Sequence, residues 1–180
     1  MNYLKYSLSF FLFFMACQNE IPPEDGVFDN PLDEEEVEYE TPALTFYPIE
    51  INTSPGGSFP IDVFVLGVED LAGSYVQFQY DKSKLQVVSI NVGSFFNDAS
   101  QAPIFMTDID DNNGIIHLNT SFLGSDSITV AGTGSLAQIV FTSLSAGESN
   151  LTFDTTCELV DPEDVAIEIK GFGEGVVHAN

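Results

Sequence analysis

Positive charge is nearly absent from this 180-residue chain. It holds four lysines and no arginine against 28 acidic residues, so its formal net charge at pH 7 is −24. Proteins bind nucleic acids through clustered lysine and arginine, so this composition argues against nucleic-acid binding. An anionic membrane surface would repel the chain for the same reason, and any membrane attachment needs another cause.

Residue types that build catalytic and metal sites are also scarce. The chain has two histidines and two cysteines, and tryptophan is missing. No Ser-His-Asp order, phosphate-binding loop or zinc-ligand spacing occurs in the sequence. We therefore expect a protein that is not an enzyme and that needs no cofactor.

Long apolar runs are missing too, apart from one near the N-terminus. Residues 6–16 are apolar and follow Lys5, but a membrane-spanning helix needs about 20 such residues. The length and flanks instead predict a secretory signal peptide. The run ends in Ala16-Cys17, which resembles the lipobox of bacterial lipoproteins. We expect a signal region over residues 1–17, with lipid on Cys17 anchoring the exported protein at the outer membrane or cell surface; an ordinary signal peptide is the alternative.

Residues 18–43 carry ten acidic side chains, four prolines and no basic residue. Such a segment buries too little apolar area to fold, and its like charges repel one another. We predict a disordered, extended tether between the anchor and the rest of the chain. A binding site for calcium or for a basic partner is the alternative interpretation of this segment.

From residue 44 to residue 180 the pattern changes to short runs in which apolar residues alternate. Phe59, Ile61 and Val63 share one side of a run, and Val76 and Phe78 share one side of the next. Glycine, proline and asparagine clusters separate these runs. The pattern predicts one all-β domain, an antiparallel two-sheet β-sandwich with jelly-roll topology and about nine strands.

Several blocks of this domain, in order, resemble the cohesin family. They are residues 54–65 (SPGGSFPIDVFV), 71–88 (LAGSYVQFQYDKSKLQVV), 93–96 (GSFF), 134–141 (GSLAQIVF) and 175–177 (GVV). The resemblance implies a non-catalytic module that binds a dockerin-type partner and attaches enzymes to a scaffold or cell surface during polysaccharide breakdown. The two positions at which the best-known cohesins place dockerin contacts hold Gly73 and Tyr75 here, so we carry no contact residue over from the family.

If a partner packs on a flat sheet face, strand alternation supplies the candidate contacts. Outward side chains that are uncharged and able to form hydrogen bonds are the least costly to desolvate in so acidic a chain. We expect the partner-binding face to contain Tyr75, Gln77, Gln79, His117, Asn119 and Gln138.

Direct binding of a polysaccharide by the same sandwich is the alternative function. The fold that the resemblance implies also groups with certain carbohydrate-binding modules. Aromatic rings that stack on sugars are the usual platform, and with no tryptophan in the chain the candidates are Tyr47 and Tyr75.

A weak calcium candidate lies between two predicted strands. Asp108, Asp110 and Asn112 place oxygen ligands at alternate positions, as calcium loops do. The other interpretation is a hairpin turn, because Asn112-Asn113-Gly114 can adopt the positive φ that such a turn requires. Calcium, if bound, would be structural.

Overall fold

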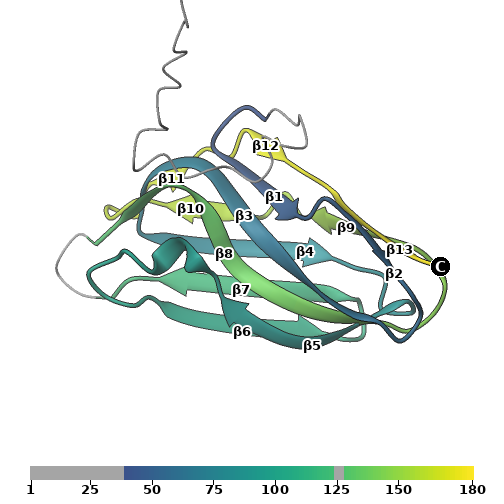
Figure 1. The fold of residues 1–180 in the computed structure, drawn as a ribbon. Coiled ribbons are helices and arrows are strands. Elements are labelled where there is room, and N and C mark those ends of the chain that lie inside the picture. The colour runs from purple at the N-terminus through teal and green to yellow at the C-terminus, as the bar shows by residue number, and fades with distance from the viewer. Residues whose placement is uncertain (1–38, 124–127) are drawn as a thin grey trace, which may run out of the picture.

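The computed structural model describes residues 39–123 and 128–180, and β-strands make up most of them (Figure 1). A single short 3-10 turn, η2 (Ser94–Phe96), follows the fifth strand of the described part. The strands are β1 (Ala43–Tyr47), β2 (Glu50–Thr53), β3 (Ser58–Leu71), β4 (Gly73–Gln79), β5 (Leu85–Val92), β6 (Ile104–Asp110), β7 (Ile115–Ser121), β8 (Val130–Ser143), β9 (Gly147–Phe153), β10 (Glu158–Val160), β11 (Ala166–Ile167), β12 (Gly171–Phe172) and β13 (Gly175–Ala179).

The strands form two packed sheets, which confirms the predicted β-sandwich. The five-stranded sheet has the order β12-β1-β3-β8-β5 and lies in front in Figure 1. The second sheet runs β11-β10-β4-β9-β13-β2, and β7 joins β4 to β6. Most neighbours are antiparallel, but β1 pairs with β12 and β13 with β2 in parallel. The structure has thirteen strands in its described part against about nine predicted, and β10 and β12 are among those too short to show alternation in the sequence.

Aromatic packing between the two sheets forms the centre of the core. Phe46 of β1 stacks on Phe153 of β9, with ring centroids 4.3 Å apart, and meets Phe78 of β4 edge-on at 5.2 Å. The predicted alternation is confirmed here, because Ile61 and Val63 are fully buried on the inner side of β3. Burying each such side chain stabilises the fold by about 1.5–3 kcal/mol.

A turn stabilised by Asp81 carries the chain from β4 in one sheet to β5 in the other. The Oδ1 atom of Asp81 accepts hydrogen bonds from the backbone N–H of Ser83 at 2.9 Å and from its hydroxyl at 2.6 Å. These bonds favour the carboxylate, with the side-chain bond from Ser83 the largest influence, so the pKa of Asp81 lies below its usual value. The turn therefore fixes where β5 begins.

The first described strand lies next to the predicted start of the domain. Strand β1 starts at Ala43, one residue before the predicted start of the domain. Tyr39 packs with Tyr47 against a small apolar cluster of Ala43, Phe64 and Leu66, separate from the main core. Residues 1–38, which include the predicted signal region, Cys17 and most of the predicted tether, lie outside the described residues. Within the described part, no helix is long and apolar enough to cross a membrane.

Candidate functional site

The outward side chains of β6, β7, β4 and β10 form a continuous surface, which we call the β4 face. Its central row runs straight across four strands. Met106 lies opposite Asn119, Asn119 opposite Tyr75, and Tyr75 opposite Glu158. Residues directly opposite one another in antiparallel strands point to the same side of a sheet. The four side chains therefore stand side by side on the outside of the sandwich.

Two further rows flank the central one on the same face. Their inward neighbours Val76, Phe78 and Leu118 belong to the buried core, which confirms that the rows point outward. The rows are Asp108, His117 and Gln77 on one side, and Ile104, Ser121, Gly73 and Val160 on the other.

Hydrogen bonds hold the polar centre of this face in place. The Tyr75 hydroxyl donates to Oε1 of Gln77 at 2.8 Å and lies 2.9 Å from Nδ1 of His117. The Tyr75 and His117 rings also stack, with centroids 6.1 Å apart. Side chains fixed before binding lose less conformational entropy when a partner arrives, so this triad is pre-organised for contact.

Exposed apolar side chains on β6 extend the face, and the sequence-based prediction missed them. Met106 is 59% exposed and Ile104 is 40% exposed, although their strand neighbours Phe105 and Ile109 pack against the core. The alternation of residues 104–110 already placed Ile104, Met106 and Asp108 on one side. That pattern could have identified them, had the outward side been known.

Charge on the three rows is confined to carboxylates. Asp108 stands beside His117 in one flanking row, and Glu158 ends the central row beyond Tyr75. The centre of the face, formed by Tyr75, Asn119 and Met106, is uncharged. An uncharged centre with acidic edges suits a partner that offers apolar groups flanked by lysine or arginine.

Five of the six predicted contact residues lie together on the β4 face, and the sixth does not. Tyr75, Gln77, His117 and Asn119 form its centre, and Gln79 lies at the end of β4 opposite Ile115. The inclusion of Gln138 was wrong. Alternation shows which residues share one side of a strand but not which sheet the strand joins, and β8 belongs to the other sheet.

Asp110, one of the calcium candidates, stabilises the β6–β7 hairpin turn. Its Oδ1 accepts the backbone N–H groups of Asn112 at 2.9 Å and Asn113 at 3.2 Å, and its Oδ2 accepts the Asn113 side chain at 2.7 Å. These bonds, that from the Asn113 side chain foremost, lower the pKa of Asp110. Asp108 lies on β6 opposite His117 of β7 instead. Among residues 39–123 and 128–180, no group of three or more His, Cys, Asp or Glu side chains could hold a metal ion.

Cys157 supports the β4 face from the gap between β9 and β10. Strands β9 and β10 share one edge of β4, and Gln77 lies at the gap between them. The Sγ atom of Cys157 accepts the Gln77 N–H and donates to the Gln77 carbonyl, both at 3.3 Å. Burial raises the pKa of the thiol. The side chain therefore acts as a hydrogen-bonding filler and not as an exposed nucleophile.

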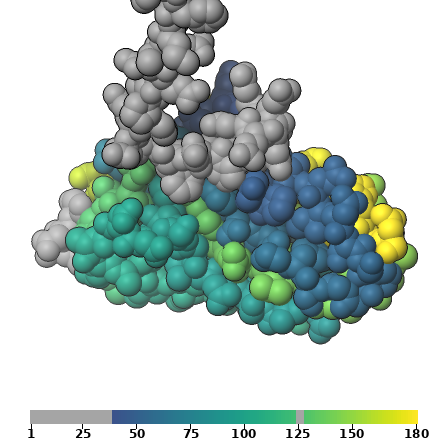
Figure 2. Space-filling view, viewed as in Figure 1, coloured from purple at the N-terminus to yellow at the C-terminus, as the bar shows by residue number. Residues whose placement is uncertain are grey.

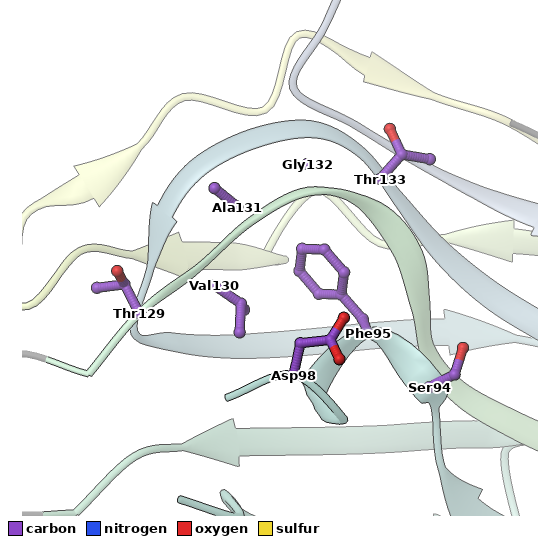
Figure 3. A pocket seen from close by; sticks show the side chains of 8 residues that line it. All are labelled: Ser94, Phe95, Asp98, Thr129, Val130, Ala131, Gly132 and Thr133. Carbon is purple, nitrogen blue, oxygen red and sulfur yellow. The ribbon is translucent and has the colours of Figure 1, made fainter. Parts of the chain in front are cut away.

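A hollow of about 620 Å³ lies beside the start of β8 (Figure 3). Ser94, Phe95 and Asp98 come from the η2 segment, and residues 129–133 line the opposite side. Phe95 packs against Gly134, where a Cβ atom would collide with its ring. The hollow belongs to the five-stranded sheet and is separate from the β4 face.

Comparison with known proteins gives one family. The cohesin domain model matches residues 50–176. A search of curated proteins finds no match.

Solved structures of the same fold include three cohesins. A non-cellulosomal cohesin from the archaeon Archaeoglobus fulgidus is 15% identical, with a TM-score of 0.63 over 77% of this chain and 90% of that one. The sixth cohesin of Acetivibrio cellulolyticus scaffoldin B, solved with a mutant Cel5 dockerin, is 17% identical, with a TM-score of 0.64 over 77% and 98%. A type I cohesin–dockerin complex from Clostridium thermocellum gives 18% identity and a TM-score of 0.63 over 77% and 98%. At these identities the likeness is one of fold.

Proposed function

The chain belongs to the cohesin domain family, and from that premise we propose that it is a non-catalytic module that binds a dockerin-type partner on the β4 face. The observation that carries the proposal is the central row, where the exposed Met106 stands beside Asn119 and the hydrogen-bonded Tyr75. Two of the similar cohesins were solved with a dockerin bound, which supports this class of partner.

The composition of the β4 face is that of an interface centre. Protein interfaces are enriched in tyrosine and methionine and depleted of charged residues at their core. Tyr75 and Met106 fit that description, and Asn119 between them can form hydrogen bonds without the cost of burying a charge. A sheet that presents these groups in one row across neighbouring strands suits a partner that contacts several strands at once.

The acidic edges define the chemistry of the partner more closely. Asp108 and Glu158 lie on opposite sides of the uncharged centre, on β6 and β10. The partner should therefore place an apolar side chain over Met106 and lysine or arginine near these two carboxylates. The net charge of −24 would speed the approach of such a basic surface, and added salt would slow it.

The proposed setting is the bacterial surface. Lipid on Cys17 would hold the exported chain at the membrane, and the acidic segment between Cys17 and Tyr39 would extend the cohesin domain away from it. A partner that is itself a polysaccharide-degrading enzyme would then be retained beside the cell. This part of the proposal rests on the N-terminal sequence and on the family.

Capture of a partner from the organism's own secreted proteins tests the proposal. We expect the immobilised full-length chain to retain a protein that carries a dockerin module, identified by mass spectrometry. Tyr75→Ala should weaken its binding by about 1–3 kcal/mol, as expected for an interface hot spot. The exposed Glu174 lies outside the β4 face, and Glu174→Gln serves as the control that leaves affinity unchanged.

Two results would contradict the proposal. One is the failure of the chain to retain any dockerin-bearing protein from a secretome that contains them. The other is a captured dockerin that binds Tyr75→Ala as tightly as it binds the unchanged chain.

A further inference from the structure

The outer face of the five-stranded sheet, on the far side of the sandwich from the β4 face, carries a groove of its own. Its residues form a second straight row: Tyr47 of β1 lies opposite Asp62 of β3, Asp62 opposite Gln138 of β8, and Gln138 opposite Asn91 of β5. With neighbouring strands about 4.8 Å apart, the row is about 14 Å long. In Figure 2, part of β8 (green) is exposed between the blue strands and the teal segment.

The groove has a volume of about 460 Å³. That size is typical of sites for small ligands, whereas protein partners usually bind flatter surfaces. The segment after β5 forms one wall, because Gly93 and Ser94 follow that strand directly and Asn97 follows η2. Its lining residues are Tyr47, Asp62, Phe64, Asn91, Val92, Gly93, Ser94, Asn97, Ser135 and Gln138.

The polar groups of the row suit a ligand with many hydroxyl groups. Asp62 accepts a hydrogen bond from the Ser135 hydroxyl at 2.7 Å and one from the Gln138 amide at 3.4 Å. A carboxylate has about four acceptor positions, so Asp62 keeps acceptors for a ligand's hydroxyl groups. The amides of Gln138 and Asn91 are exposed and offer donors and acceptors together.

An aromatic ring closes one end of this row. Tyr47 is half-buried and lines the groove, and Phe64 holds it edge-on with ring centroids 5.9 Å apart. A ring fixed in this way can stack on the apolar face of a sugar, while the neighbouring carboxylate and amides bind the hydroxyl groups.

The charge of the groove and of the whole chain indicates which class of sugar can bind. The groove lining contains one carboxylate, Asp62, and no lysine. The whole chain is strongly acidic, so an anionic glycan would be repelled. We propose that this groove binds a neutral oligosaccharide in an extended conformation, with Tyr47 as the stacking platform and Asp62, Gln138 and Asn91 as the hydroxyl-binding groups. The site is independent of the β4 face, so a glycan and a protein partner would occupy opposite sides of the module.

Titration calorimetry on the full-length chain tests this site. The probes are cellohexaose, xylohexaose and mannohexaose, with hexagalacturonate as the anionic comparison. We expect saturable binding of at least one neutral hexasaccharide and none of hexagalacturonate. Gln138→Ala should weaken that binding about tenfold, the effect of losing one well-placed hydrogen-bonding group. Tyr47→Phe, which keeps the ring, should bind within about threefold of the unchanged chain.

Gln79→Ala is the matched control, because Gln79 is also an exposed glutamine on a strand but lies in the other sheet. It should leave glycan affinity unchanged. Gln138 is exposed, so its truncation should leave the thermal unfolding midpoint intact and any loss of binding can be assigned to the groove. The proposal is overturned if no neutral probe binds, if hexagalacturonate binds equally well, or if Gln79→Ala and Gln138→Ala have the same effect.

Discussion

Cys157 occupies the gap between two strands that share one edge of β4. Its thiol accepts the backbone N–H of Gln77, a residue of the predicted binding face, whose carbonyl also accepts the N–H of Asp154 at 2.8 Å. A buried N–H group that loses its acceptor costs about 1–3 kcal/mol. We therefore expect Cys157→Ala to lower the free energy of unfolding by that amount in urea titrations. Cys157→Ser, which keeps a donor and an acceptor, should cost less, and equal losses for the two variants would contradict this role.

The Cys157 thiol also makes the stability of the fold depend on pH, in a direction that can be predicted. Burial raises the pKa of the folded Cys157 thiol, so the unfolded chain loses this proton first as the pH rises. The stability contribution is therefore complete below about pH 8.5 and is lost as the pH rises toward the folded pKa. The stability advantage of the unchanged chain over Cys157→Ser should shrink as the pH rises above about 8.5.

Gly114 is required by the β6–β7 turn for two reasons. Its φ is +68°, and a Cβ atom there would collide with the carbonyl oxygen of Tyr80. Gly56 provides a matched comparison, because its φ is +84° but a Cβ atom would enter open space. A left-handed backbone costs a non-glycine residue about 1–2 kcal/mol. Gly56→Ala should lose about that much stability and Gly114→Ala clearly more, whereas equal thermal shifts would show that the collision is relieved.

At the scale of elements, the turn between β4 and β5 depends on one carboxylate. Hydrogen bonds from Ser83 lower the pKa of Asp81, so its contribution to stability is present above the unfolded pKa of about 3.9. The contribution is lost as the pH falls through the folded pKa. Because the side chain is partly exposed, we expect Asp81→Ala to cost about 1 kcal/mol at pH 7. Urea titrations from pH 7 into the acid range should show this difference shrinking as the pH falls through the folded pKa; a difference that stays constant in acid would contradict the role of the charge.

The sequence revealed the strands that alternate clearly and missed what depends on pairing between distant segments. Phe78 and Gln77 were assigned to inner and outer sides from β4 alone, and the structure agrees. Gln138 was misplaced because the sheet to which β8 belongs is set by its pairing with β3 and β5. Met106 was overlooked because β6 has apolar residues on both of its sides, so the alternation alone does not show which side faces outward. The row that contains Tyr47 and Asp62 could not be predicted, because it depends on how four strands are paired and no single run of residues shows that pairing.

At the scale of the whole molecule, the sandwich presents two unlike faces on one strongly acidic body. The β4 face presents Tyr75 with the exposed Met106 on its edge strand β6, and the opposite sheet is hollowed around Asp62 and Gln138. A module of this kind could bind a protein on one side while the other side holds a glycan. Both proposals place the binding residues on rigid strands.

The proposed membrane anchor is tested by a change at one residue. Because Ala16-Cys17 closes the only long apolar run near the N-terminus, Cys17→Ser should prevent lipid attachment. We expect this variant to leave the membrane fraction and appear in the soluble fraction of the native bacterium. A variant that stays with the membranes after washing in high salt would show that another feature anchors the chain.

The central claim is that the partner binds on the β4 face. It is tested most directly by comparing two variants, each of which places one new charge on a different sheet. Met106 on β6 and Val88 on β5 are equally exposed, each at 59%, so Met106→Glu and Val88→Glu disturb the fold to the same small degree. The measurement is the affinity of each full-length variant for the captured dockerin-bearing protein, by titration calorimetry. A buried unpaired carboxylate should weaken binding of Met106→Glu at least about tenfold, whereas Val88→Glu should bind like the unchanged chain. Equal affinities for the two variants, or a loss confined to Val88→Glu, would contradict the account.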